Sequence, residues 1–199
     1  MRFGELTFEE IGQCAKEDWP VSIPTGCTEQ QGPHLPVDYD TWLVEKLSLA
    51  ASDYAKDIYA IDSLVVPVIP FGPTLEHRGF GSGYIHLPQS DHETIIAAVL
   101  DSLADQGFQC MVIWRGCGQH NLEKVVERFN ESHAGKAKVL HPELPHFEIW
   151  CRVSDGSIPG GHADSFSTSL ALYLRPESVR IEKIRDPNNR QVDWDDPDL

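Results

Sequence analysis

The sequence predicts one α/β domain in which helices cover both faces of a mostly parallel sheet. Short apolar runs that read as strands alternate along the chain with longer segments of helical spacing. Glycine-rich polar loops follow several of these runs. With 199 residues, of which 41% are hydrophobic and 24% charged, the chain lies in the range of a single soluble domain. Alternating strands and helices imply crossover connections, so we expect a three-layer α/β/α fold over residues 1–199, with an acidic tail from about residue 186.

The first half of the chain supplies two helices and two strands in this interpretation. Residues 7–16 are expected to form a helix, because apolar side chains recur at helical spacing, and residues 20–24 read as a short buried strand. Asp40 is expected to cap a helix over residues 41–55. The apolar run at residues 65–70 is a second strand candidate, which its prolines weaken or place near an edge.

The second half repeats the alternation. We expect Asp91 to cap a helix over residues 92–107, with Ile95, Val99 and Leu103 on one face. Four further elements are expected: a strand at 110–114, a helix at 122–133, a strand at 147–153 before a glycine-rich turn, and a helix at 165–174.

Charge and cysteine content exclude several classes of protein. A formal net charge of −15 argues against binding to a nucleic-acid backbone, which depends on clustered Lys and Arg. No apolar run approaches the roughly 18 residues that a membrane span needs, and the first residues lack the pattern of a signal peptide. The five cysteines are widely spread and form no CxxC pair. We therefore expect a cytoplasmic protein with buried thiols and no disulfide framework.

Polar residues that could bind a metal or take part in catalysis collect in three loops. In open α/β sheets, loops at the carboxyl ends of strands meet in one cleft, so these loops are expected to converge. They are TEQQGPHLPVDYD (28–40), RGCGQHN (115–121) and GGHADS (160–165).

These loops contain a mixed set of possible metal ligands. Glu29 and Asp40 offer carboxylate oxygens, and His34, His120 and His162 offer imidazole nitrogens, a combination that suits zinc, manganese or iron. Each residue also has an ordinary structural explanation. Acidic residues near Gly and Pro often form turns or caps, and a loop histidine often only forms hydrogen bonds.

The order of the motifs resembles the creatininase (creatinine amidohydrolase) family of metal-dependent hydrolases, which act on small cyclic or amide substrates. The resemblance rests on E-Q-x-G-P-H-L-P-x-x-x-D after a strand, G-x-G-x-x-N after a later strand, and G-H-A before a helix with T-S-L. It covers about residues 20–175. It implies a three-layer α/β fold, a homo-oligomer of six alike subunits and a metal-bound water as the nucleophile.

The resemblance assigns metal-ligand roles to Glu29 and Asp40, with Asp40 at the position that bridges two metals in the family. Gln31 stands where the family has a ligand His, and Cys117 stands at the His of the N-G-H motif. Gln119 falls at a ligand Glu of creatininase when no gap is placed. The loop is one residue longer when anchored at Asn121, so His120 is an alternative ligand to Cys117.

The resemblance also implies a catalytic group. His162 matches the catalytic histidine of the family, while Ser167 replaces the Glu before Thr-Ser. Glu76 and His77 resemble an acid-His pair in the middle loop, from which we assign Glu76 a catalytic role and His77 a role in substrate binding. Arg115 occupies the place of a family Asn.

The altered ligands favour one metal over two. Glu29, Asp40 and one of Cys117 or His120 would form a three-ligand site with an open position for water, with zinc expected before manganese or iron. His162 would shuttle a proton to the leaving group.

Four residues are expected to bind substrate, and two of them have alternative roles. Arg115 would hold a carboxylate, phosphate or carbonyl oxygen, or else pair with Glu29 or Asp40. Gln31 would contact substrate or only brace its loop. The substrate-binding set is Arg115, Gln31, His34 and His77.

Three functions remain open from the sequence. The first is hydrolysis of a C–N bond in a small polar cyclic amide, with creatinine itself not expected as the substrate. The second is hydrolytic C–C cleavage of a cyclic diketone such as an oxidised inositol. The third is a catalytically silent family member that acts as a binding or structural subunit.

Overall fold

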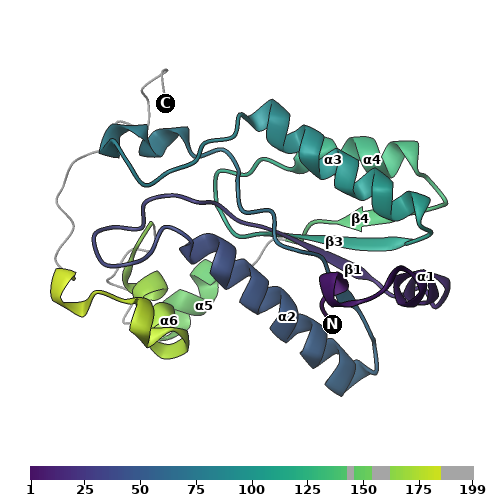
Figure 1. Ribbon diagram of the computed structural model, residues 1–199, viewed down its shortest axis with the longest axis horizontal. Coiled ribbons are helices and arrows are strands. Elements are labelled where there is room, and N and C mark those ends of the chain that lie inside the picture. The colour runs from purple at the N-terminus through teal and green to yellow at the C-terminus, as the bar shows by residue number, and fades with distance from the viewer. Residues whose placement is uncertain (143–145, 154–161, 185–199) are drawn as a thin grey trace.

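The computed structural model describes residues 1–142, 146–153 and 162–184 (Figure 1). Within them, four strands form one all-parallel sheet in the order β2-β1-β3-β4. Adjacent parallel strands need crossover connections, and helices provide them. The strands are β1 (Val21–Thr25), β2 (Leu64–Val65), β3 (Cys110–Arg115) and β4 (Lys138–Leu140).

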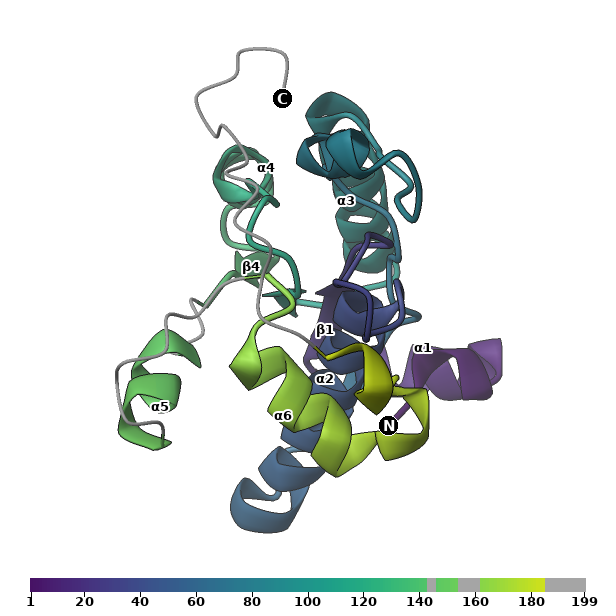
Figure 2. The ribbon, with the colours of Figure 1, turned by 90° about the vertical axis from the view of Figure 1, so that its left-hand side faces the viewer.

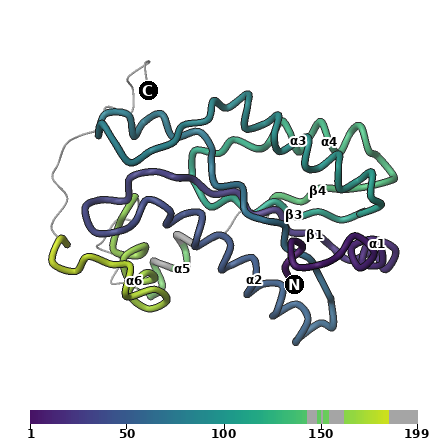
Figure 3. Tube along the Cα trace, in the orientation of Figure 1, coloured from purple at the N-terminus to yellow at the C-terminus, as the bar shows by residue number. Residues whose placement is uncertain are grey.

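Helices cover both faces of the sheet, which confirms the expected α/β fold. In Figures 1 and 2, α3 and α4 lie on one face, and α2 crosses the other face with α5 and α6 on its side. The Cα trace in Figure 3 shows the same layers, with α1 at the end of the sheet near the N-terminus. The helices are α1 (Phe8–Lys16), α2 (Tyr39–Tyr59), α3 (Gln89–Asp105), α4 (Glu123–Ser132), α5 (His146–Val153) and α6 (Ser165–Leu174). In the part of the chain that the structure describes, four short 3₁₀ helices lie at Phe3–Glu5 (η1), Leu75–Phe80 (η2), Pro176–Ser178 (η3) and Ile181–Lys183 (η4).

The main core forms between the central strands and the α3–α4 layer. Ile23 of β1 and Ile113 of β3 are fully buried, as are Ile96 and Leu100 of α3. Strands that are covered on both faces carry near-continuous apolar side chains, which is how β1 and β3 were recognisable in the sequence.

Several predicted elements need correction. Residues 147–153 lie in the helix α5 rather than in a strand, and the strand β4 was not predicted. Asp40 and Asp91 are not N-caps. Each lies in the first turn of a helix that begins earlier, where a carboxylate favours the helix dipole. The 165–174 helix is confirmed as α6.

The burial of α2 and α3 differs from the predicted apolar stripes. Ile95 of α3 is 39% exposed, while Ile96 is buried. In α2, Ser48 and Ser52 face the interior, whereas the last turns expose apolar side chains. Ser48 bonds the carbonyl of Val44 at 2.8 Å, so its hydroxyl is satisfied without water. The exposed apolar residues of this helix are Leu47, Tyr54, Ile58 and Tyr59.

The pairing of β1 with β3 fixes the position of the loops that follow them. Thr25 pairs with Arg115 at the last position of both strands. One residue farther on, the Gly116 amide still donates to the Thr25 carbonyl at 2.8 Å. The two loops therefore leave the same edge of the sheet side by side. No helix in the described ranges is long and apolar enough to cross a membrane.

Gly26, directly after β1, tests how closely the sheet packs against α2. A Cβ at this position would lie 2.5 Å from the Thr41 Cα and 2.7 Å from its backbone nitrogen. We expect Gly26→Ala to destabilise the fold by about 1–3 kcal/mol, because backbone atoms of α2 must move. Urea unfolding measures the change.

The matched control is Gly12→Ala within α1, where a Cβ would meet nothing within 4 Å. This substitution is expected to stabilise the protein by about 0.5–1 kcal/mol, because alanine is the better helix former. Equal stability of the two variants would contradict the close packing at Gly26.

Candidate functional site

The segment after β1 places alternate side chains in the interior. Cys27, Glu29 and Gln31 are buried, while Thr28 and Gln30 are partly exposed. This alternation is typical of an extended chain, in which every second side chain points to the same face. The segment therefore delivers three polar side chains to one side of the sheet edge.

Two carboxylates and two thiols converge at this edge. The ligand atoms of Cys27, Glu29, Asp40 and Cys117 all lie within 4.8 Å of one another. Cys27 is 0% exposed, Glu29 2% and Cys117 7%. The Cys117 Sγ lies 3.8 Å from the Glu29 Oε2. The structure thus brings together three of the four predicted metal ligands and adds Cys27, which the sequence analysis had treated only as a buried thiol.

The protonation of this cluster is consistent with a site for a cation. Burial and the neighbouring Glu29 carboxylate raise the pKa of Asp40 well above its usual value. Burial is the largest effect on Glu29 and acts to raise its pKa, but the hydrogen bond and charge of His77, the charge of His162 and a hydrogen bond with Asp40 together outweigh it, so the net shift is downward. A contact with Cys117, together with burial, raises the pKa of the Cys27 thiol. Without a cation the cluster must keep protons, and a divalent cation could replace them, so the residues fit a metal.

The other oxygen of Glu29 faces two histidines. His77 Nε2 and His162 Nδ1 each lie 3.3 Å from Glu29 Oε1, and the three ligand atoms form a second compact group. Glu76 in η2 contacts the same His77 nitrogen at 3.4 Å. Glu29 therefore belongs to both groups of side chains.

His77 is buried in this network rather than open to a substrate. Burial acts to lower its pKa, but bonds to Glu29 and Glu76 raise it to about 9. The side chain of Gln30 contacts the other ring nitrogen of His77. Its Oε1 accepts from the Gly32 amide at 2.9 Å, so its Nε2 donates to His77 Nδ1 at 3.0 Å, the atom that an added proton would occupy.

His162 lies at the exposed side of the site. Its side chain is 30% exposed, and its ring centre is 4.5 Å from that of His77. Its Nε2 contacts the backbone oxygen of Gln30. Burial and the adjacent His77 lower the pKa of His162 below its usual value.

His120 belongs to a separate buried chain of polar side chains. Its Nε2 lies 3.0 Å from Cys27 Sγ, and its Nδ1 lies 3.2 Å from Thr25 Oγ1, which also contacts His92 Nε2 at 3.0 Å. Burial, with smaller effects of His92 and Arg115, lowers the pKa of His120 to about 3. The ring is therefore neutral, and it groups with Cys27 and Cys117 rather than with the carboxylates.

The remaining predicted residues have other contacts. Gln31 lies beside Asp40, where its amide stabilises the carboxylate and acts to lower the pKa of Asp40. His34 Nε2 contacts Thr168 Oγ1 at 2.8 Å, which ties the loop to α6. Neither His34 nor Arg115 falls within the metal-binding groups of the described residues.

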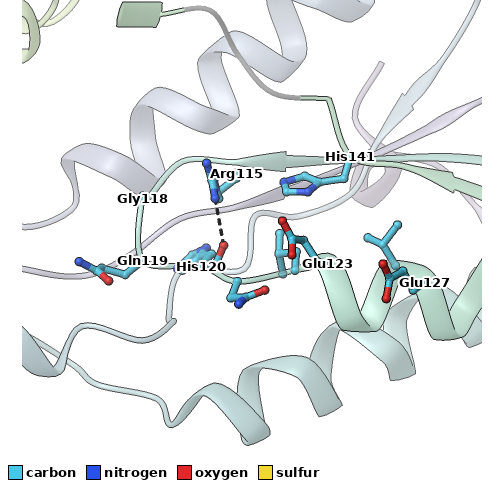
Figure 4. Close-up of a pocket in the computed structure, with 10 residues that line it drawn as sticks. Arg115, Gly118, Gln119, His120, Glu123, Glu127 and His141 are labelled. Atoms are coloured by element: carbon cyan, nitrogen blue, oxygen red, sulfur yellow. Dashed lines mark hydrogen bonds between the residues drawn. The ribbon is translucent and has the colours of Figure 1, made fainter. Parts of the chain in front are cut away.

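Arg115 lines an open pocket of about 560 Å³ that borders the 115–121 loop. Figure 4 shows it near His141 and Glu123, with a hydrogen bond of 3.3 Å from its Nη1 to the backbone oxygen of His120. Among the described residues it forms no ion pair with Glu29 or Asp40, which removes that alternative.

The sequence analysis missed Cys27 and Gln30 at the site. Gln30 holds both histidines, His77 through its side chain and His162 through its carbonyl. The spacing C-x-E-x-Q after a predicted strand could have indicated Cys27, because residues two apart in an extended chain share a face. The contacts of Gln30 depend on residues distant in sequence, so no local pattern predicts them.

The buried His120 predicts an acid-sensitive fold in the metal-free protein. An unfolded histidine has a pKa of about 6.5, and folded His120 has one of about 3. The unfolded chain therefore binds more protons between these values, so stability is present above pH 6.5 and falls as pH decreases toward 3. From pH 7 to pH 5, His120 alone should remove about 2 kcal/mol.

Urea unfolding of the chelator-treated protein at pH 7 and pH 5 measures this loss. A His120→Gln variant should show a difference between the two pH values that is smaller by about 2 kcal/mol. If the variant and the native protein lost the same amount, His120 would not be the source of the acid sensitivity.

Known proteins resemble this chain in sequence and in fold. The sequence model of a family described as creatininase, creatinine amidohydrolase, matches residues 4–198. A mycofactocin precursor peptide peptidase of Mycobacterium tuberculosis is 28% identical over 197 residues, covering 93% of this chain and 70% of the relative. A creatinine amidohydrolase of Pseudomonas putida is 24% identical over 207 residues, covering 92% and 75%. A 3-dehydro-scyllo-inosose hydrolase of Thermotoga maritima is 23% identical over 186 residues, covering 90% and 58%.

Solved structures show the same fold. A creatinine amidohydrolase superposes with a TM-score of 0.77 at 21% identity, covering 94% of this chain and 76% of that one. A manganese form of creatininase gives 0.77 at 20% identity, covering 94% and 77%. A variant creatininase of the Zn-Zn type gives 0.75 at 22% identity, with the same coverage. Because the family model spans nearly the whole sequence, the chain belongs to the creatininase family.

Proposed function

We propose that the protein is a metal-dependent hydrolase that cleaves a C–N bond in a small polar cyclic amide or a related amide. The observation that carries this proposal is the convergence of the buried Glu29 and the partly buried Asp40 beside two histidines at the carboxyl edge of the sheet. Two relatives, a peptidase and a creatinine amidohydrolase, are named for C–N bond hydrolysis.

Glu29, Asp40 and Cys117 would hold the metal. Their donor atoms lie in one group, and burial together with the neighbouring Glu29 carboxylate raises the pKa of Asp40, so a bound cation would relieve an unfavourable charge there. When bound, a divalent metal would polarise the carbonyl group of the substrate and lower the pKa of a water to about 7. Zinc is the expected metal, with manganese and iron as alternatives.

His162 would move the proton, and its contacts indicate which atom does so. The Gln30 carbonyl can only accept, so Nε2 of His162 carries the hydrogen in the neutral ring. The free lone pair is then on Nδ1, which faces Glu29. Nδ1 would accept a proton from the attacking water and then donate a hydrogen bond to the Glu29 carboxylate. It would later return the proton to the leaving nitrogen. The lowered pKa keeps the ring neutral and able to accept at pH 7.

Glu76 and His77 would support this transfer from the interior. His77 donates from Nε2 toward Glu29 and Glu76, which fixes the orientation of the Glu29 carboxylate. This assignment moves His77 from substrate binding to positioning. Arg115, Gln31 and His34 remain proposed contacts for substrate or for the loops that surround it.

Hydrolytic C–C cleavage of a cyclic diketone is the second candidate. One relative is named for 3-dehydro-scyllo-inosose, an oxidised inositol, and attack of an activated water on a ring carbonyl serves either reaction. A catalytically silent subunit is the third candidate, and absence of stoichiometric transition metal from the purified protein would favour it.

Replacing His162 should separate catalysis from metal binding. We expect His162→Asn to lower turnover by about 10² to 10⁴ while metal content stays near that of the native protein. Glu29→Gln and Asp40→Asn should lose metal and activity together. Elemental analysis and a panel of cyclic amides, short peptides and cyclic diketones provide the measurements. If the His162 variant lost its metal, this residue would be a ligand and the assignment would be wrong.

We also propose that the protein assembles as a homo-oligomer, a hexamer by resemblance to the family. The outer face of α2 supports self-association, because Tyr54, Ile58 and Tyr59 are each about 60% exposed. Light scattering at micromolar concentration should give a mass several times that of one chain, and Ile58→Lys should reduce it. A monomeric native protein would contradict this expectation.

A further inference from the structure

Cys27 and Cys117 occupy equivalent positions on neighbouring strands. Thr25 pairs with Arg115, and the Gly116 amide bonds the Thr25 carbonyl, so the pairing continues past the strand ends. Each cysteine lies two residues beyond its paired strand residue. Neighbouring strands are about 4.8 Å apart, so the two segments that leave them start close together. The Sγ atoms of the two cysteines lie within 4.8 Å of each other.

The two thiols share their space with both carboxylates. The four donor atoms of Cys27, Cys117, Glu29 and Asp40 lie within 4.8 Å of one another, and Cys117 Sγ is already 3.8 Å from Glu29 Oε2. In a tetrahedral zinc site, bond lengths of about 2.0–2.3 Å place neighbouring ligand atoms roughly 3.3–3.8 Å apart. The pairs of donor atoms need to approach by at most about 1.0–1.5 Å to reach this geometry.

His120 is placed to hold Cys27 rather than to bind the metal with the carboxylates. Its Nε2 is 3.0 Å from Cys27 Sγ, and its Nδ1 is engaged by Thr25. The backbone of Gly72 packs against the ring so closely that a Cβ there would lie 2.1 Å from Nε2. The ring is therefore confined, and a nitrogen directed at the sulfur fixes the orientation of Cys27.

We propose that Cys27 and Cys117 are both metal ligands, so that one metal has two sulfur and two oxygen donors from the protein, and that His120 is a positioning residue for Cys27. The water or substrate oxygen that the proposed hydrolysis requires would then enter as a fifth ligand. This inference rests on the proposed metal-dependent function and deepens it. As the two metal–sulfur bonds form, each thiol releases its proton to solvent. Thiolate donors select zinc over manganese, so the metal preference should be strong.

Cobalt as a spectroscopic probe tests the proposal without relying on activity. The chelator-treated protein under reducing conditions, loaded with Co²⁺, should show near-ultraviolet thiolate-to-cobalt charge-transfer absorption. Cys27→Ser and Cys117→Ser should each reduce this absorption by about half, and the double variant should abolish it. Cys110→Ser, at the opposite end of β3, is the matched control and should keep the full absorption.

Zinc X-ray absorption on the unaltered protein needs no variant and covers the case in which a variant does not fold. A sulfur shell near 2.3 Å supports the proposal, and a shell of only nitrogen and oxygen near 2.0 Å overturns it. His120→Gln should weaken zinc binding by about 10- to 100-fold while keeping the sulfur shell, as expected of a positioning residue.

The outcomes separate this inference from the proposed function. Stoichiometric metal without sulfur contacts would overturn the thiolate ligands but leave the metal-dependent hydrolase standing. Absence of stoichiometric binding of Zn²⁺, Co²⁺ and Mn²⁺ would overturn both.

Discussion

The parallel pairing of β1 with β3 is the constraint on which the rest of the site depends. Because Thr25 and Arg115 are paired at the ends of their strands, the two following loops start at the same level along the strand direction. A shift of one residue would turn Cys27 or Cys117 to the other face of the sheet, since side chains alternate along an extended chain. The sheet core therefore specifies the chemistry of its edge, and Gly26 and Gly116 let α2 approach closely enough to bring Asp40 into the cluster.

Glu29 connects two chemically different halves of the site. One of its oxygens faces thiols and Asp40, and the other faces His77 and His162. A change in the protonation of the thiols or of Asp40 therefore affects the two histidines through the Glu29 carboxylate, and the reverse also holds. The opposite pKa shifts of Glu29 and Asp40 reflect this asymmetry, because only Glu29 has histidine partners in direct contact.

Sequence patterns predicted the architecture well and the site in part. Hydrophobic runs and helical spacing indicated β1, β3, α1, α4 and α6, because these elements bury continuous or periodic apolar faces. The same reasoning failed at residues 147–153, whose apolar and aromatic residues suit a strand or a helix equally, and at the short strand β4, where only Val139 is buried.

The loop motifs predicted Glu29, Asp40 and Cys117 together because strand ends meet at one edge. They left Cys117 and His120 as alternatives, since the loop alone does not reveal which side chain turns toward the carboxylates. Burial determines this outcome: His120 is enclosed by Thr25, His92 and Gly72. Such tertiary contacts have no local sequence pattern, which is also why Cys27 was overlooked.

The two histidines that contact Glu29 differ in their exposure to solvent, so one side of this carboxylate is more accessible than the other. Among the described side chains that contact this carboxylate, His77 is 6% exposed and His162 is 30% exposed. Solvent and small solutes therefore approach Glu29 past His162. If His162 carries the proton, as proposed, the residue that transfers it is also the more exposed of the two histidine partners of Glu29. A substitution there would then be expected to change two rates at once, by slowing proton transfer and by altering the exchange of ions and water with the interior.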